Sequence, residues 1–172
     1  GRGDFNLAAN VSFTRWKDIQ ADFIDPSGLP STANIGDGRI LAATVSAGFQ
    51  VDSSLRIDAG ITYNDSDVDR PSRPLLSGPV TRIPNIAAVT GRVAFDYVRP
   101  VGEQLELTAH GWAHFVGQSR LGIGPELGEL QGNYFDTGVD LRLGTDRFGV
   151  TFSVSNLTDE AGNRFALGTP FT

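Results

Sequence analysis

Hydrophobic and polar residues alternate along much of this chain. In the stretch Leu55–Asn64, every second position is apolar or aromatic, namely Leu55, Ile57, Ala59, Ile61 and Tyr63. A period of two puts these residues on one face of a β-strand, whereas a helix would scatter them around its axis. The same pattern predicts seven strands: Asn6–Trp16, Arg39–Gln50, Leu55–Asn64, Ala88–Tyr97, Leu105–Phe115, Tyr134–Leu143 and Phe148–Leu157.

The connections between these strands alternate in length. Short turns are expected near residues 51–54, 99–103 and 144–147, and long loops near 17–37, 65–84 and 117–132, with a fourth beginning at Thr158. The first long loop contains a turn signal, Asp25-Pro26-Ser27-Gly28. An all-β antiparallel up-and-down meander with short turns at one end and long loops at the other is typical of part of a transmembrane β-barrel. A Greek-key sandwich gives no reason for that asymmetry.

Charged and aromatic residues refine this prediction. The expected polar face carries Arg56, Asp58, Arg92, Asp96, Glu106, Asp140 and Arg142. On the apolar face, aromatic residues gather near both strand ends around an aliphatic middle. Phe13, Trp16, Tyr63, Phe115 and Phe135 lie near the long loops, and Phe49, Phe95, Tyr97 and Phe148 near the short turns, while Phe152 fits neither band. Two aromatic bands around an aliphatic belt match the two interfaces of a membrane.

Composition excludes several other classes. No run of 18 apolar residues exists, so no transmembrane helix is expected, and the absence of cysteine rules out disulfides and thiolate metal sites. A net charge of −6 argues against nucleic-acid binding. No Ser-His-Asp or paired-carboxylate arrangement can be singled out, because charges alternate along every expected strand. We therefore expect no enzymatic activity and no cofactor.

Several segments resemble TonB-dependent outer-membrane receptors. The most specific is the end of the last expected strand with its tail, SNLTDEAGNRFALGTPF, which is similar to the penultimate barrel strand and the loop after it. The segments Ser12–Ile40, Val116–Gly124 and Gln131–Gly144 resemble the C-terminal third of these barrels. The resemblance implies a 22-stranded barrel with an N-terminal plug in the outer membrane of a Gram-negative bacterium. It also implies import of a scarce solute, such as an iron–siderophore complex, with energy relayed by TonB.

Three parts of that family pattern have no counterpart here: the plug domain, the segment that contacts TonB, and a last strand ending in an aromatic residue. Residues 1–172 are therefore expected to be the C-terminal portion of a receptor barrel. Seven strands with two free edges cannot close a barrel, and open edges are not tolerated in lipid. We expect this portion alone to aggregate or to need detergent.

Candidate ligand contacts lie in the lumen or the outer loops. His110 and His114 share one strand face, but at roughly 13 Å apart along the strand they cannot hold one metal ion. His114 is kept as a lumen contact. Asp67, Arg70 and Arg73 in the second long loop, and Arg120 in the third, are candidates for the outer vestibule. Each of them also fits a plain solvated position.

Two other functions stay open at this point. A porin-type channel without energy coupling would share the barrel pattern, and a soluble all-β binding domain would share the alternation. The expected partners are outer-membrane lipid, a small-molecule ligand, and, in the intact receptor, the plug and TonB. Iron–siderophore, haem, cobalamin and carbohydrate receptors are not told apart by these residues.

Overall fold

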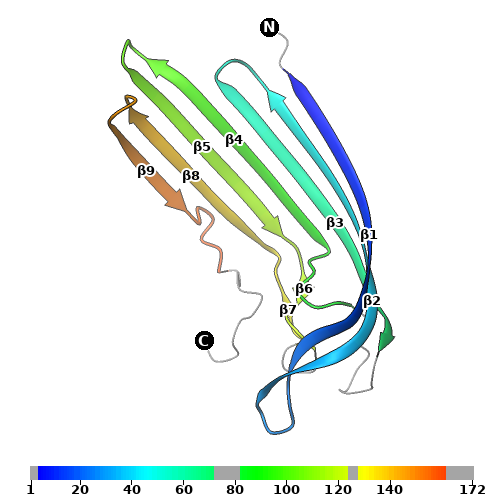
Figure 1. Cartoon of the computed structure of the whole chain (residues 1–172). Coiled ribbons are helices and arrows are strands. Elements are labelled where there is room, and N and C mark those ends of the chain that lie inside the picture. Colours follow the sequence, from blue (N-terminus) through cyan, green and yellow to red (C-terminus); the bar gives the residue numbers. More distant parts are fainter. Residues whose placement is uncertain (1–3, 72–81, 124–127, 162–172) are drawn as a thin grey trace.

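The computed structural model describes residues 4–71, 82–123 and 128–161, and these residues form strands and no helix. The alternating stretches all become strands, because their side chains divide between two faces. The strands, in chain order, are β1 (Phe5–Ile24), β2 (Pro30–Gln50), β3 (Leu55–Pro71), β4 (Val89–Val101), β5 (Leu105–Val116), β6 (Ser119–Arg120), β7 (Leu130–Gln131), β8 (Tyr134–Gly144) and β9 (Gly149–Ser155) (Figure 1).

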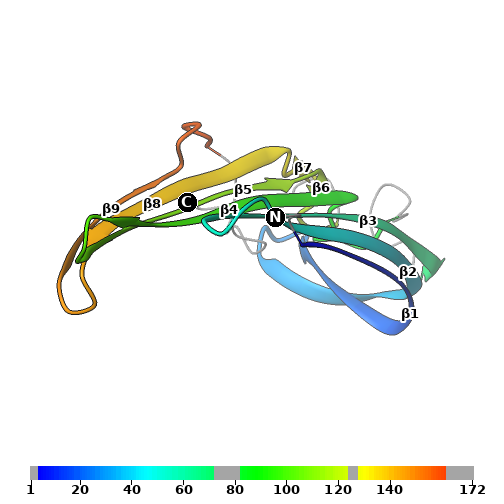
Figure 2. The same cartoon turned by 90° about the horizontal axis from the view of Figure 1, so that it is seen from above.

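Seven of these strands build one antiparallel sheet. Its order is β1-β2-β3-β4-β5-β8-β9, so each strand pairs with its neighbour in the chain, apart from the small β6–β7 pair between β5 and β8. The prediction of an all-β up-and-down meander is therefore confirmed. Seen from above, the sheet is an open, curved wall with β1 and β9 as its two edges (Figure 2).

The two ends of the sheet differ as predicted. The turns β2–β3, β4–β5 and β8–β9 all lie at one end and connect their strands directly (Figure 1). The longer connections, between β3 and β4 and between β5 and β8, lie at the other end. We call these the short-turn end and the long-loop end.

The predicted long loop at residues 17–37 is wrong. β1 runs on to Ile24 and β2 begins at Pro30, so only residues 25–29 form a turn. The alternation was hidden because the pairing shifts between Trp16 and Ile19, and again between Ile19 and Gln20. A β-bulge of this kind changes which face each following residue occupies. The two strands therefore continue as a long hairpin beyond the rest of the sheet (Figure 1).

Other boundaries also move. β3 extends to Pro71, into the predicted loop 65–84, and β4 continues through Pro100 to Val101, so the next turn is shorter than expected. The predicted loop 117–132 contains the β6–β7 pair. Phe148 precedes the bounds of β9 rather than opening that strand. In β3, β4 and the β6–β7 pair, backbone pairing to a neighbouring strand continues where the hydrophobic alternation has ended, whereas β9 is shorter than its alternating stretch.

Strand pairing joins the apolar positions into one continuous face. One cross-strand row contains Phe5, Phe49, Ile57, Phe95, Gly111, Val139 and Val154. The next row towards the long loops contains Leu7, Ala47, Ala59, Val93, Ala113 and Thr137. The charged residues predicted for the polar face fall in the rows between. Side chains on one face of paired strands form one surface, so the sheet has one apolar and one polar side.

One predicted member of the aromatic bands lies on the wrong face. Trp16 pairs with Gly38, whose missing side chain points towards Ile19 and Ile83 on the polar side of the sheet. Phe13, three residues earlier, belongs to the apolar face, where the Arg15 guanidinium lies over its ring. The prediction for Trp16 was therefore wrong, because three steps along a strand lead to the opposite face.

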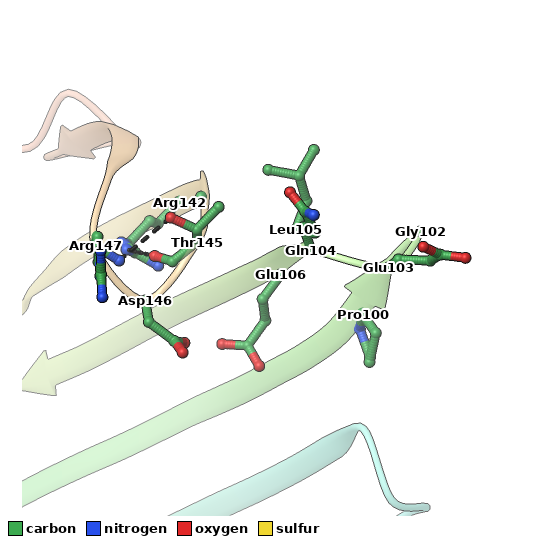
Figure 3. Close-up of a pocket in the computed structure, with 11 residues that line it drawn as sticks. Pro100, Gly102, Glu103, Gln104, Leu105, Glu106, Arg142, Thr145, Asp146 and Arg147 are labelled. Atoms are coloured by element: carbon green, nitrogen blue, oxygen red, sulfur yellow. Dashed lines mark hydrogen bonds between the residues drawn. The ribbon is translucent and has the colours of Figure 1, made fainter.

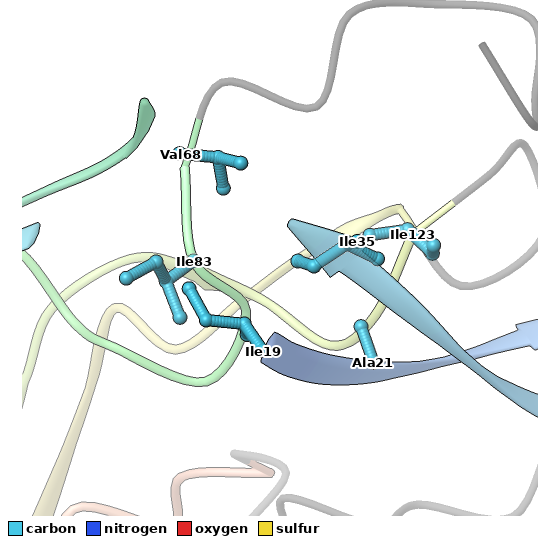
Figure 4. Close-up of a cluster of buried hydrophobic side chains, with 6 residues drawn as sticks. All are labelled: Ile19, Ala21, Ile35, Val68, Ile83 and Ile123. Atoms are coloured by element: carbon cyan, nitrogen blue, oxygen red, sulfur yellow. The ribbon is translucent and has the colours of Figure 1, made fainter. Parts of the chain in front are cut away.

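Among the described residues, the buried hydrophobic side chains form one cluster at the long-loop end (Figure 4). Ile19 is the most buried, at 1% exposed. The cluster joins the β1–β2 hairpin to the end of β3 and to the two longer connections. Its members are Ile19, Ala21, Ile35, Val68, Ile83 and Ile123. A Cβ at Gly38 would lie 2.9 Å from Ile19 Cδ1 and 3.2 Å from Ile83 Cδ1, so glycine is what lets these two isoleucines approach.

The hairpin tip gives a testable pH dependence. One Asp25 carboxylate oxygen accepts hydrogen bonds from the Ser27 hydroxyl at 2.5 Å, the Ser27 N–H at 2.8 Å and the Leu29 N–H at 3.0 Å. These bonds, the Ser27 hydroxyl foremost, lower the pKa of Asp25 below its ordinary value of 3.8. A lowered folded-state pKa stabilises the turn above the ordinary value, and that stabilisation is lost as the pH falls below it.

We expect amide hydrogen exchange at Ser27 and Leu29 to accelerate, relative to intrinsic rates, below about pH 4. Asp25→Ala should cause the same acceleration at neutral pH and remove its dependence on acid. Protection at these two amides that is unchanged by Asp25→Ala would contradict this role for the carboxylate.

Candidate functional site: the polar face of the sheet

The polar face carries a line of charged and polar residues across six strands. Cross-strand pairing places Gln50, Arg56, Asp96, His110, Asp140 and Ser153 in one row. Opposite charges directly across neighbouring strands attract, so the placement of Arg56 opposite Asp96 stabilises the register. The row lies towards the short-turn end.

Two side-chain contacts involve residues of this row, one within β3 and one between β4 and β5. The Arg56 guanidinium donates to both oxygens of Asp58, at 2.7 and 2.8 Å. His110 Nδ1 lies 2.7 Å from an Asp96 carboxylate oxygen, and the imidazole stacks on the Trp112 indole at 5.7 Å between ring centroids. A carboxylate at this distance favours an Nδ1–H tautomer, which leaves Nε2 facing away from Asp96.

A second row holds the predicted residue His114. Its Cα partners are Arg92 on β4 and Asp136 on β8. Arg92 in turn lies opposite Gly60, and its side chain lies alongside it: a Cβ at Gly60 would be 3.6 Å from Arg92 Nε. Arg92 and His114 therefore sit side by side, with a carboxylate on the next strand.

A hollow of about 270 Å³ opens beside Arg92 and His114. Its other polar walls are hydroxyls: Thr44, Ser46, Thr62 and Thr90. The Thr44 and Thr62 hydroxyl oxygens lie 3.0 Å apart and share a hydrogen bond. A guanidinium, an imidazole and several hydroxyls can donate to the oxygen atoms of a carboxylate, a phosphate or a polyhydroxylated solute. This is the part of the polar face best suited to touch a small ligand.

Another hollow, of about 720 Å³, lies at the short-turn end between the β4–β5 and β8–β9 turns (Figure 3). Arg142 lies on its wall and donates to the Thr145 carbonyl at 2.8 Å. Its charged lining is mixed: Glu103, Glu106, Arg142, Asp146 and Arg147. Charges of both signs give this hollow no clear preference for an anion or a cation.

The other predicted site residues are dispersed. Asp67 lies at the long-loop end of β3, on the side opposite the buried Val68, and accepts a hydrogen bond from Arg39 at 3.1 Å. This bond raises the pKa of Arg39. Arg120, in β6, donates to the Gly128 carbonyl. Arg70 lies in β3 with its side chain outside the described structure, and Arg73 falls outside the described residues.

Of the predicted residues whose side chains the structure describes, Asp67, His114 and Arg120 are not gathered into one site. Asp67 lies on the apolar side of β3, beyond the last hydrophobic residue of that side. His114 lies on the polar face. Arg92 and the threonines around His114 were missed because the pattern of a single strand does not reveal which residues it faces on its neighbours. The usable signal was weak: Arg92 and His114 both occupy polar positions of adjacent predicted strands.

The described residues contain no group of three or more His, Asp or Glu side chains placed to hold a metal ion. In the same part of the chain, no helix has the length and apolar character needed to cross a membrane. No protein-family model, curated protein or solved structure matches this sequence.

Proposed function

We propose that this chain forms part of the wall of a transmembrane β-barrel, in a TonB-dependent outer-membrane receptor that imports a scarce solute such as an iron–siderophore complex. The observation that carries the proposal is the apolar face of the sheet. Val11 is 72% exposed, Ile61 55% and Val150 77%, although all three lie on a continuous hydrophobic surface. Soluble proteins rarely expose apolar surface on this scale.

The apolar band crosses the strands obliquely, as expected if the sheet spans a flat apolar layer such as a lipid bilayer. Phe5 shares a row with Val139 of β8, yet the apolar face of β8 continues four residues further towards the short turns, to Leu143. At the other boundary, Phe135 shares a row with Ala9, four residues before Phe13. Both limits thus drift the same way across the sheet.

That drift corresponds to a strand tilt. Four residues span about 13 Å, and five strand spacings span about 24 Å, which gives an inclination of about 30°. When tilted strands cross a flat apolar layer, the limits of the apolar band must shift along each successive strand in this way. Strands of outer-membrane barrels tilt by roughly 35–45°, which is close to this value.

The width of the band fits the same apolar layer. On β1, β2 and β3 the apolar face runs from Phe5 to Phe13, from Leu41 to Phe49 and from Leu55 to Tyr63, each a span of eight residue steps. Eight steps measure about 27 Å along the strand, and an inclination of about 30° reduces this to about 23 Å. The apolar band of outer-membrane barrels is about 25 Å tall.

Charged residues bound the band on the apolar side. Arg15, Arg39 and Asp65 follow the last apolar residues at the long-loop end, and Arg99 follows Tyr97 at the short-turn end. The polar face, with Arg92 and His114, then lines the lumen. The receptor assignment, beyond a barrel wall, is supported by the resemblance of the strand ends and loops.

The first test uses the full-length gene product expressed in a Gram-negative host. We expect it in the outer-membrane fraction, with a mobility on SDS gels that changes on boiling, since closed barrels resist detergent. A water-soluble product without this change would overturn the membrane assignment, and the apolar face would then have to be a core.

A second measurement separates the receptor from a porin. Uptake of a radiolabelled ferric siderophore should depend on TonB, so it should stop in a host that lacks TonB. A boiling-dependent shift with diffusive uptake that is unchanged without TonB would favour the porin-type channel instead.

A further inference from the structure

The apolar side of β1 ends in an aromatic residue followed by a cation. Arg15 lies two positions beyond Phe13, and its guanidinium carbon is 5.8 Å from the centroid of the Phe13 ring. A guanidinium over an aromatic face gains a cation–π attraction while its N–H groups still point outward to donate. Phe13 also marks the long-loop boundary of the apolar band.

Arg15 and Arg39 are direct cross-strand partners, but only one of them is neutralised. Arg39 lies 3.1 Å from an Asp67 oxygen and 3.6 Å from an Asp69 oxygen. Within the described ranges, no carboxylate lies within 4 Å of the Arg15 or Lys17 cations. Like charges directly opposite each other are destabilising, so this pair favours an additional anion at Arg15.

The acidic residues nearby do not supply that anion. Asp37, on β2 two residues from Arg39, holds its carboxylate at the Asp18 N–H, 3.1 Å away, and not within 4 Å of the Arg15 or Lys17 cations. Asp65, Asp67 and Asp69 all lie on β3, two strand spacings from β1, or about 10 Å. Salt screens charges over about 8–10 Å, and two of these carboxylates are already engaged by Arg39. An anion bound at Arg15 would therefore meet the Arg15 and Lys17 cations, and the opposing carboxylate on the adjacent strand is Asp37, which is already bonded to the Asp18 N–H.

We propose that Arg15, assisted by Lys17, binds the phosphate group of a membrane lipid headgroup in the leaflet at the long-loop end. This inference rests on the proposed membrane orientation, which puts Phe13 at the interface and Arg15 at headgroup depth. A planar guanidinium can donate two parallel hydrogen bonds to a phosphate, and its apolar stem lies along the lipid-facing surface.

The test measures lipid binding by the full-length gene product in a neutral detergent. Diphosphoryl lipid A and its dephosphorylated form are added separately, and the bound lipid is counted by native mass spectrometry. The wild type should prefer the phosphorylated lipid. Arg15→Gln should weaken that binding about fivefold and Arg15→Gln with Lys17→Gln about 25-fold, since each cation near a lipid surface contributes comparably.

The control is Arg147→Gln, because Arg147 is an exposed arginine in the turn at the opposite end. It should bind the phosphorylated lipid as the wild type does. Equal binding by the Arg15→Gln and wild-type proteins would overturn the phosphate site. Competition by inorganic phosphate at the same concentration as the lipid would overturn the lipid assignment.

A separate readout distinguishes this failure from failure of the proposed function. The boiling-dependent gel shift of the wild type is measured without added lipid A. If the gel mobility changes on boiling but the phosphorylated lipid is not preferred, the barrel proposal stands and the phosphate site is overturned. If the gel mobility does not change on boiling, both the barrel proposal and the phosphate site are overturned.

Discussion

Ala9→Arg is expected to lower the free energy of unfolding in a bilayer by about 2–4 kcal/mol, because the proposed membrane orientation puts Ala9 at the middle of a lipid-facing strand, where arginine carries this cost. Ala9 is the central position of the apolar span Phe5–Phe13 and is exposed. Replacing a small exposed side chain removes almost no packing, so the cost reports on the medium outside the sheet. Denaturant titration in bilayers or detergent, followed by tryptophan fluorescence, measures it.

Two matched variants make this result specific. Asn10→Arg places the same side chain on the polar face and should change the free energy by about 0.5 kcal/mol or less, as surface substitutions do. Leu41→Arg, at the edge of the apolar band, should cost about 0–1 kcal/mol beyond its lost apolar contacts. Equal costs for Ala9→Arg and Asn10→Arg would show that water contacts both faces, and the lipid-facing assignment would fail.

Ile19→Ala is expected to destabilise the long-loop end by about 2–5 kcal/mol, the range for truncating a fully buried isoleucine. Ile19 is 1% exposed and packs in the cluster that joins the β1–β2 hairpin to Val68, Ile83 and Ile123. Losing three carbons there leaves a cavity next to a glycine, Gly38, which cannot fill it. We expect hydrogen exchange to rise in the hairpin beyond Trp16.

The same experiment includes a control on the same strand. Val11→Ala truncates a side chain that is 72% exposed on the apolar face, so exchange in the hairpin should stay unchanged. Exchange in the strands between Phe5 and Phe13 should be similar in both variants, because their backbone bonds lie away from the cluster. If Ile19→Ala left the hairpin as protected as in the wild type, the cluster would not be what holds the long-loop end together.

The sheet could be predicted well from the sequence because the division of apolar and polar side chains between two faces determines each strand. Wherever five apolar residues occupy every second position, as in Leu55–Tyr63, the faces and the strand follow from the period alone. The prediction failed beyond the apolar band. Within residues 17–37, only 25–29 form a turn, and the rest is strand because its backbone pairs across the hairpin. The register shifts between Trp16 and Gln20 break the alternation, so the pattern of one strand alone does not reveal the pairing.

The candidate site could be predicted from the sequence only in small part. His114 could be placed on a polar face, but its neighbours depend on register, which joins it to Arg92 and to the Thr44–Thr62 pair. Asp67 illustrates the opposite error: a charged residue in an expected loop is in fact a strand residue on the apolar side, bound to Arg39. Cross-strand partnership is a long-range property, and local patterns do not encode it.

The neighbour-to-neighbour order of the sheet has an evolutionary consequence. Every strand pairs with the next one in the main sheet, and the turns alternate between the two ends. Adding or losing a single strand would reverse the direction of all that follow and send their long connections to the opposite end. Adding or losing a hairpin changes neither. Such a sheet therefore keeps its long connections at one end only if it grows or shrinks in steps of two strands, and the even strand numbers of single-chain bacterial barrels agree with such steps.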